Sequence, residues 1–354
     1  MSSIATIHEQ PIADRINWLF DLAQKYSAEF CSPEAFLARE RYLALHPTAI
    51  AVMKCMDGRI NIPVATTTPP GIIQPFRNLG GMFDMGWPHL GEVLAQYVQR
   101  MIRSGRRILI LITYHFSRGD VHRGCSGFGC DAEAAIAHTR QLRKQMEAIF
   151  GIAHDSVYPL ICGFETDEDA LLLHSADGRI LDLSAYITVD ELGAELAQRL
   201  HDMPQEMRSD LLPLLIGNLA HIKRLRLERR ALTVEHREWM ICLGRGFDFL
   251  HTPNLALIIG PYSPDLADPI RKAAAIIESN MAAGRIPDDG FLLLASVPYD
   301  EIGVDRARAA MKSNFLSMFA AEVIEREFHG LARKMIRRTS VLDWNSRRID
   351  ALPE

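Results

Sequence analysis

The stretch TAIAVMKCMDGR, residues 48–59, decides how this chain is interpreted. Residues 48–55 form an almost unbroken apolar run, which is typical of a strand buried on both faces of a parallel sheet. Cys55, Asp57 and Arg59 then stand at alternate positions. Alternate residues of an extended chain point to the same side. The run therefore predicts a buried strand whose end presents a thiol, a carboxylate and a guanidinium together.

A second buried strand is predicted at residues 106–116, RRILILITYHF, with His115 at its end. Helical patterns precede and follow it, at 88–105 and 131–151, whereas residues 61–84 are rich in Pro, Gly and Thr and are expected to be irregular. This alternation predicts an α/β fold with a mainly parallel sheet flanked by helices. Ligands of such sheets bind at the carboxyl ends of the strands, where Cys55 and His115 both fall.

The same order of elements returns from residue 236. A strand carrying Cys242, a loop, a helix, a strand ending at Tyr299 and a long helical pattern over 304–338 echo residues 48–150. The gap from Cys55 to His115 is similar to the gap from Cys242 to Tyr299. We therefore expect a degenerate internal duplication.

Composition narrows the class of function. The chain has 354 residues and a net charge of −5, and a phosphate-binding surface normally needs a basic excess, so nucleic acid is not the expected partner. No apolar run approaches the roughly 18 residues that cross a membrane, and the N-terminus does not resemble a secretory signal. Six cysteines in a chain of this size suit a reducing compartment. We expect a cytoplasmic protein that acts on a small molecule.

Cys55, His115 and Cys125 are the candidate metal ligands. Cys125 lies in the loop that follows the second strand. Two thiolates and an imidazole suit zinc, and three protein ligands leave a fourth position open, as in catalytic sites. Zinc lowers the pKa of bound water to about 7 and so supplies hydroxide at neutral pH.

Asp57 and Arg59 are the candidate catalytic residues. An Asp beside an Arg remains ionised and can accept a hydrogen bond from a nucleophilic water. The alternative is that residues 57–59 form an ordinary Asp-Gly turn at the end of a strand.

Four motifs in order resemble the β-class carbonic anhydrases over roughly residues 47–184. They are CMDGR at 55–59, FRNLGG at 76–81, ILILITYH at 108–115 and the predicted hairpin at 163–183. The resemblance implies reversible hydration of CO2 to bicarbonate by a zinc-bound hydroxide that Asp57 orients. It also implies a supporting loop, with side-chain-to-backbone bonds from Arg77 and Asn78 and close backbone approach at Gly80 and Gly81.

The second zinc motif departs from the family pattern, His-x-x-Cys at the strand end. Here Cys125 comes ten residues after His115, while a literal His-x-x-Cys uses His122 and Cys125. The position of His115 at the end of a predicted strand favours it as the ligand, because a strand end positions a side chain better than a loop does. Motif spacing favours His122. We expect His115, with His122 as the alternate ligand, and Cys130 is a weaker substitute for Cys125.

An insertion between these ligands together with a degenerate second repeat resembles the carboxysomal-shell branch of the family. Cys242 is followed by Leu-Gly-Arg rather than x-Asp-x-Arg, so no metal site is expected in the repeat. The printed sequence lacks the long disordered N-terminal region expected of a shell-targeted member, so we do not infer carboxysome association from it. We predict four parts: an N-terminal helical segment at 1–46, a zinc-binding catalytic domain at 47–189, a helical connector at 190–231 and the second repeat at 232–354.

Two other functions remain open from the sequence. One is hydrolysis of CS2 or COS, linear electrophiles that suit the same hydroxide. The other is a zinc-stabilised structural or assembly protein, in which Asp57 or Cys130 closes the fourth zinc position. The resemblance also implies pairing of α/β units, so a homodimer or higher homo-oligomer is expected.

Overall fold

The computed structural model describes residues 6–185, 188–228, 235–250 and 252–353. Contacts divide the chain into two units. One contains Leu37–Cys55 and Ile60–Val234, and the other contains Met1–Phe36, Met56–Arg59 and Glu235–Glu354. The four residues that directly follow Cys55 therefore belong, by their contacts, with the C-terminal part of the chain.

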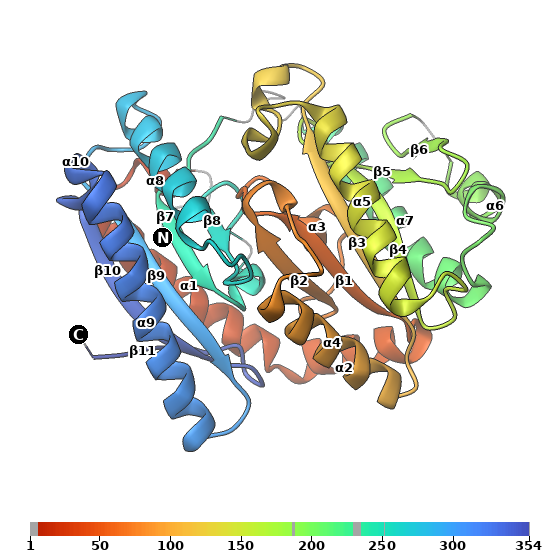
Figure 1. Ribbon diagram of the computed structural model, residues 1–354, viewed down its shortest axis with the longest axis horizontal. Helices are drawn as coiled ribbons and strands as arrows, with labels where there is room; N and C mark the ends of the chain where they lie inside the picture. Colours follow the sequence, from red (N-terminus) through yellow and green to blue (C-terminus); the bar gives the residue numbers. More distant parts are fainter. Residues whose placement is uncertain (1–5, 186–187, 229–234, 251, 354) are drawn as a thin grey trace. The chain divides into compact units, whose positions relative to one another are not determined.

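The first unit is built on a six-stranded sheet of order β2-β1-β3-β4-β5-β6, labelled in Figure 1. The four strands from β2 to β4 are parallel, and β5 and β6 complete the sheet as antiparallel strands. The strands are β1 (Ala49–Cys55), β2 (Ile73–Asn78), β3 (Ile108–Phe116), β4 (Val157–Glu165), β5 (Ala170–His174) and β6 (Ile180–Asp182). The two predicted strands that carry Cys55 and His115 are confirmed as β1 and β3, which lie in the interior of this sheet.

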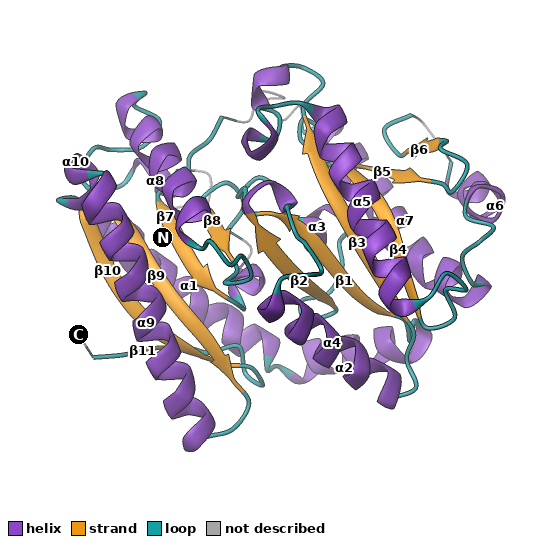
Figure 2. Ribbon diagram, viewed as in Figure 1, coloured by secondary structure: helices purple, strands orange, loops and turns teal. Residues whose placement is uncertain are grey.

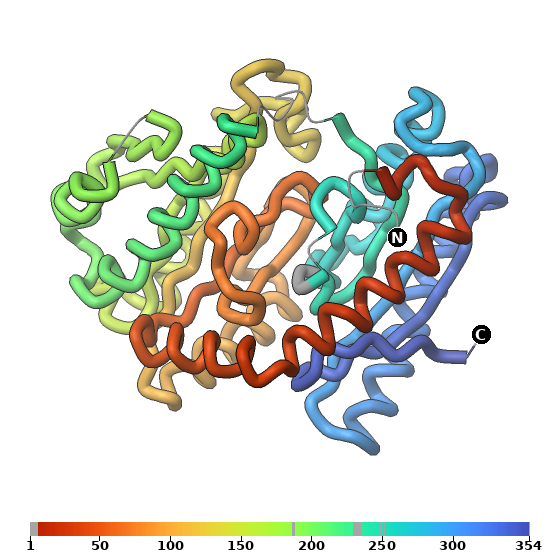
Figure 3. Tube along the Cα trace, turned by 180° about the vertical axis from the view of Figure 1, so that it is seen from behind, coloured from red at the N-terminus to blue at the C-terminus, as the bar shows by residue number. Residues whose placement is uncertain are grey.

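Helices flank the sheet of the first unit. Figure 2 shows α4 and α5 on one face, and Figure 3, from behind, shows α7 on the other. The helices are α2 (Pro33–Leu45), α3 (Ile62–Ala65), α4 (Pro88–Arg103), α5 (Ala132–Phe150), α6 (Val189–Arg199) and α7 (Gln205–Leu227), with short 3₁₀ turns η2 (Leu79–Gly81), η3 (Val121–Arg123) and η4 (Ser126–Phe128). The last residues of the predicted connector, 229–231, lie outside the described residues.

Residues 61–84 are more ordered than expected. They contain α3, β2 and η2, and β2 pairs in parallel with β1. Pro75 sits inside β2, and proline is tolerated in a sheet at an edge strand, where it removes no ladder bond on the outer side. The edge position of β2 explains why its sequence lacks a buried strand's apolar run.

The second unit has a five-stranded sheet of order β11-β10-β9-β7-β8. Its strands are β7 (Met240–Gly244), β8 (Ala256–Ile259), β9 (Phe291–Tyr299), β10 (Met335–Asp343) and β11 (Ile349–Ala351). The helices of this unit are α1 (Ile12–Phe30), α8 (Ala267–Ala282), α9 (Val304–Glu327) and α10 (His329–Ala332). Two short 3₁₀ turns, η1 (Ile7–Glu9) and η5 (Phe247–Leu250), also belong to it. The helical pattern predicted through 338 was wrong at its end, because Met335–Arg338 pair with the buried strand β9.

The two sheets share one topology. Read from the edge, β2-β1-β3-β4-β5 matches β8-β7-β9-β10-β11 in order, with three parallel pairings followed by one antiparallel pairing in each. The connecting helices also correspond, since α4 and α8 precede the third strand of their repeat and α5 and α9 follow it. This shared topology supports the duplication and the predicted α/β fold.

None of the helices in the described ranges is long and apolar enough to cross a bilayer.

Candidate functional site

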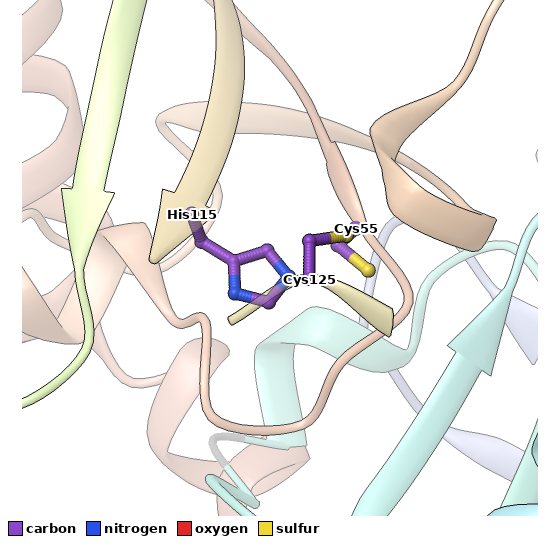
Figure 4. A group of neighbouring side chains, drawn as sticks. All are labelled: Cys55, His115 and Cys125. Carbon is purple, nitrogen blue, oxygen red and sulfur yellow. The ribbon is translucent and has the colours of Figure 1, made fainter. Parts of the chain in front are cut away.

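Three potential metal ligands meet at the carboxyl ends of β1 and β3. Cys55 is the last residue of β1, His115 lies near the end of β3, and Cys125 directly precedes η4. Neighbouring parallel strands end at the same edge of a sheet, which brings the first two together. The ligand atoms of all three lie within 4.8 Å of one another, and all three residues are buried. Figure 4 shows the imidazole of His115 turned toward the two cysteines.

This donor set fits zinc. Zn–S bonds of about 2.3 Å and Zn–N bonds of about 2.0 Å span donor atoms at this spacing with little movement. Two sulfurs and one imidazole nitrogen are the ligand types that zinc prefers, and hard cations such as Mg²⁺ prefer oxygen. Three ligands also leave one tetrahedral position for a water or substrate.

The surroundings of Cys55 raise the pKa of its thiol. The pKa of Cys55 is raised well above its usual range, first by a hydrogen bond with the Cys125 thiol and then by burial. The neighbouring His115 acts in the opposite direction. A bound cation would favour the thiolate instead, so metal binding at this site is coupled to proton release.

His122 and Cys130 lie outside this group. His122 is exposed on η3, in the excursion of the chain between His115 and Cys125. The Cys130 thiol donates to the carbonyl oxygen of His122, 3.4 Å away. The structure thus places His115, rather than His122, next to the two buried cysteines.

Asp57 and Arg59 form a buried ion pair. The Arg59 Nη2 donates to Oδ2 of Asp57 at 2.6 Å, its Nε donates to Oδ1 at 3.1 Å, and its backbone N–H also donates to Oδ1 at 2.8 Å. Their side chains are 8% and 3% exposed. These contacts fix the plane of the carboxylate.

The chain offers an internal comparison for this pair. Asp177, Gly178 and Arg179 repeat the same tripeptide in the turn between β5 and β6, with the Arg179 Nε donating to Asp177 at 2.7 Å. That pair is exposed, as expected of an ordinary Asp-Gly turn. Burial therefore distinguishes residues 57–59 from a simple surface turn.

Arg77 anchors the chain on both sides of residues 56–59. Its Nη1 donates to the carbonyl oxygen of Cys55 at 3.1 Å, and its Nη2 donates to that of Ile60 at 3.0 Å. Arg77 is itself 4% exposed. One guanidinium thus fixes where the chain leaves β1 and where it returns.

The loop after β2 approaches the site closely because it lacks side chains. At Gly81, a Cβ would stand 3.1 Å from the carbonyl oxygen of Thr113 and 3.4 Å from the backbone nitrogen of Cys55. At Gly127, in η4, a Cβ would stand 2.7 Å from the Cα of Gly80. Gly80 and Gly81 also both have a positive φ of 66°. The Asn78 amide donates to the carbonyl oxygen of Met82 at 2.8 Å and so closes the turn.

A second group of polar side chains surrounds Asp57, and the sequence analysis did not identify it. Carboxylate oxygens of Asp57 and Glu238 and a ring nitrogen of His236 lie within 4.8 Å of one another. The His236 Nδ1 bonds the carboxylate of Glu238 at 2.9 Å, and that carboxylate is fully buried. Burial alone would lower the pKa of His236, but the charges of Glu238 and then Asp57 outweigh it and raise the pKa above its usual value.

The backbone around Asp57 is held by residues of the same unit. Backbone N–H groups of Asn254 and Ile258 donate to the carbonyl oxygens of Gly58 and Met56 at 2.6 and 3.0 Å. A Cβ at Gly58 would lie 2.6 Å from the carbonyl oxygen of Ala256. Only glycine allows the segment that carries Asp57 to come this close.

The second repeat lacks the first repeat's donors at the equivalent strand ends. Cys242 is buried in β7, but Gly244 stands where the first repeat has Asp57, and β9 contains no histidine corresponding to His115 of β3. A Cβ at Gly244 would lie 1.9 Å from the carbonyl oxygen of Ser296, its partner in β9. An aspartate side chain therefore has no room there.

Residues 36–211 are similar to a known protein family. This range matches the family model described as Carboxysome Shell Carbonic Anhydrase, catalytic domain. No curated protein sequence matches the chain. The matched range includes Cys55, His115 and Cys125.

Proposed function

The chain is a carbonic anhydrase that belongs, through residues 36–211, to the carboxysome shell carbonic anhydrase family, and we propose that it hydrates CO2 reversibly at a zinc centre held by Cys55, His115 and Cys125. The grouping of these three buried donors within 4.8 Å is the observation that carries the proposal. We further propose that residues 47–189 form the catalytic domain and residues 232–354 a repeat without a zinc site.

Zinc bound by these residues would generate a strong nucleophile from water at neutral pH. The chain's own side chains then decide how that nucleophile is used. An ionised carboxylate can only accept hydrogen bonds, so a water or hydroxide next to Asp57 must donate a hydrogen bond to it. Its lone pair is then directed away from Asp57 and toward the carbon of CO2.

Arg59 makes Asp57 suitable for this task. Three of its N–H groups occupy the carboxylate, as described above, and they fix both its orientation and its charge. Asp57 is buried and lies together with His236 and Glu238, so its carboxylate is in a polar cluster inside the protein rather than in bulk water. Asp57 is thus the proposed catalytic acceptor, and Arg59 positions it.

The test combines metal content with gas turnover on the full chain. We expect about one zinc per chain and CO2 hydration measurable by stopped flow with a pH indicator. Cys55→Ser should lose both zinc and activity, and Asp57→Ala should lose activity alone. A wild-type chain with one zinc and no CO2 hydration would contradict the proposal, and turnover of COS or CS2 in its place would identify those gases as the substrates.

A further inference from the structure

The chain makes a long excursion after β3 before it reaches Cys125. Residues 117–124 form this excursion, and they separate the strand that carries one proposed zinc ligand from the loop that carries another. In the second repeat, α9 follows β9 after residues 300–303 alone, whereas α5 follows β3 only after residues 117–131. The excursion is therefore a feature of the repeat that holds the three buried donors.

Apolar packing does not fix the excursion. Its 3₁₀ turn η3 contains no buried residue, and Val121 in that turn is 62% exposed. Holding such a segment in one conformation costs backbone entropy that no buried side chain offsets here. Polar contacts must therefore fix the stretch of chain between the two ligands.

Asp167 provides the first of these contacts. It follows the end of β4, which lies beside β3 in parallel, so both strands end at the same edge of the sheet. The Ser117 hydroxyl donates to Oδ1 of Asp167 at 2.9 Å, and the backbone N–H of Gly119 donates to Oδ2 at 2.8 Å. Asp167 is itself only 6% exposed. Its carboxylate thus holds the start of the excursion, two residues beyond His115.

The contacts continue along the excursion. The backbone N–H of Asp120 donates to the Ser117 hydroxyl at 3.1 Å, and the backbone N–H of His122 donates to Oδ1 of Asp120 at 2.9 Å. The Arg123 Nε lies 3.6 Å from Oδ2 of Asp120. The charge of Arg123 also favours the ionised form of Asp167 and so lowers its pKa. A connected set of polar contacts therefore runs from the end of β4 to the end of η3.

Glu165 supports Asp167 from below. This last residue of β4 is 1% exposed, and its Oε1 accepts the backbone N–H of Asp167 at 2.9 Å and that of Arg118 at 3.3 Å. Burial raises the pKa of Glu165 to about 7. Burial acts on Asp167 in the same direction, but hydrogen bonds from Gly119, Glu165 and Ser117 outweigh it and hold this second pKa below its usual value. Asp167 is therefore the ionised acceptor of the two.

We propose that Asp167 is a positioning residue of the zinc centre, which fixes the excursion so that His115 and Cys125 keep the spacing that a bound zinc ion needs. The inference rests on the zinc centre of the proposed function. Asp167 acts through Ser117 and Gly119. Residues that hold metal ligands in place from outside the coordination sphere typically change metal affinity by about 10- to 100-fold when they are replaced.

The test is the rate at which the full chain loses zinc to an excess of a chromophoric chelator. Asp167→Ala should lose zinc about 10- to 100-fold faster than wild type. Ser117→Ala removes the hydroxyl that links Asp167 to Asp120, so it should also accelerate the loss. This smaller change keeps the test decisive in case Asp167→Ala folds poorly.

Asp210→Ala is the matched control. Asp210 is 5% exposed and accepts the backbone N–H of Thr48 at 2.9 Å, just before the opposite end of β1. Both aspartate variants should unfold at lower urea concentration than wild type, because each loses a buried acceptor of a backbone N–H. Asp210→Ala should nevertheless lose zinc at the wild-type rate.

Cobalt substitution gives a second measurement that does not depend on turnover. The visible absorption bands of cobalt report the geometry of its ligands. They should shift in Asp167→Ala and keep their wild-type positions in Asp210→Ala. This difference would separate a positioning role of Asp167 from a general loss of stability.

Wild-type rates of zinc loss in folded Asp167→Ala and Ser117→Ala would overturn the inference. An equal acceleration in Asp210→Ala would also overturn it, because the effect would then follow from destabilisation alone. Zinc loss is measured without CO2, so a wild-type chain that binds zinc and does not hydrate CO2 would contradict the proposed function and leave this inference intact.

Discussion

Arg59 holds both carboxylate oxygens of Asp57 inside the protein, whereas Arg179 holds Asp177 in the same tripeptide on the surface. The two pairs share their chemistry and differ in burial. They therefore provide a matched comparison in which only one carboxylate has a proposed catalytic task.

Asp57→Asn should lower kcat for CO2 hydration by about 10²-fold or more, on the order of the loss seen when one positioned catalytic hydrogen bond is removed. The amide keeps the shape of the side chain but presents an N–H group where the reacting oxygen needs an acceptor. Stopped-flow hydration assays measure kcat, and zinc content should stay near one per chain. Asp177→Asn is the control and should retain wild-type kcat. Equal losses in both variants would mean that the effect is structural.

Cys55→Ser and Cys125→Ser should each abolish tight zinc binding, because a hydroxyl is a poor replacement for a thiolate ligand. Metal analysis after purification and dialysis measures the loss. Cys130→Ser and His122→Ala should both retain zinc, since neither side chain belongs to the buried group. Loss of zinc in His122→Ala, with retention in His115→Ala, would exchange the ligand assignment.

Zinc affinity should rise with pH between 6 and 8. The Cys125 hydrogen bond and then burial hold the proton on Cys55, so zinc must displace it, and the apparent affinity gains about tenfold per pH unit for each proton released. Competition with a chromophoric chelator at three pH values measures this slope. An affinity that does not change over this range would show that the cysteines are already deprotonated.

The contribution of His236 to stability should disappear as the pH rises. Its pKa is raised in the folded protein, so the imidazolium stabilises the fold fully below its unfolded pKa of about 6.5. The contribution is then lost as the pH passes through the higher folded pKa. Urea unfolding between pH 5.5 and 8.5 should therefore show a wild-type advantage over His236→Asn at low pH alone.

Glu238→Gln should remove the same pH dependence, because the Glu238 carboxylate is the main charge that raises the pKa of His236. Glu235→Gln is the control, since Glu235 is exposed and pairs with Arg285. A wild-type stability advantage that persists unchanged up to pH 8.5 would contradict this account.

The sequence predicts the central strands well and the edge strands poorly. β1 and β3 are buried on both faces, so their apolar runs are unbroken. β2 lies at the sheet edge, where Gln74 and Pro75 are only partly buried, and the start of β10 has the composition of a helix. Both strands form because a neighbouring buried strand provides the hydrogen-bonding partner, which local sequence does not reveal.

Cys55 and His115 could be predicted to meet because they lie at the ends of two neighbouring parallel strands, and Cys125 because it lies in the loop that follows the second of them. His236 and Glu238 could not, because their partner Asp57 lies in the other half of the sequence. The sequence feature that could have indicated them is that His236 and Glu238 stand two positions apart just before β7. In an extended segment this spacing places both side chains on one side.

Gly244→Asp should destabilise the chain by about 3 kcal/mol or more, because its Cβ has no space next to Ser296. Chemical denaturation measures the change. Gly284→Asp is the matched control, since Gly284 also has a positive φ but nothing within 4 Å of a built Cβ, and it should cost far less. A well-folded Gly244→Asp variant would show that β7 and β9 can separate.

The close approach of Gly244 to Ser296 also has a historical meaning. If the second repeat once carried an acid at this position, the backbone has since closed over the place that the side chain occupied. A single reversion would then meet a steric barrier before it offered any benefit. A second centre in this repeat would on that ground require the strand pair β7–β9 to be rebuilt before an acid could occupy position 244.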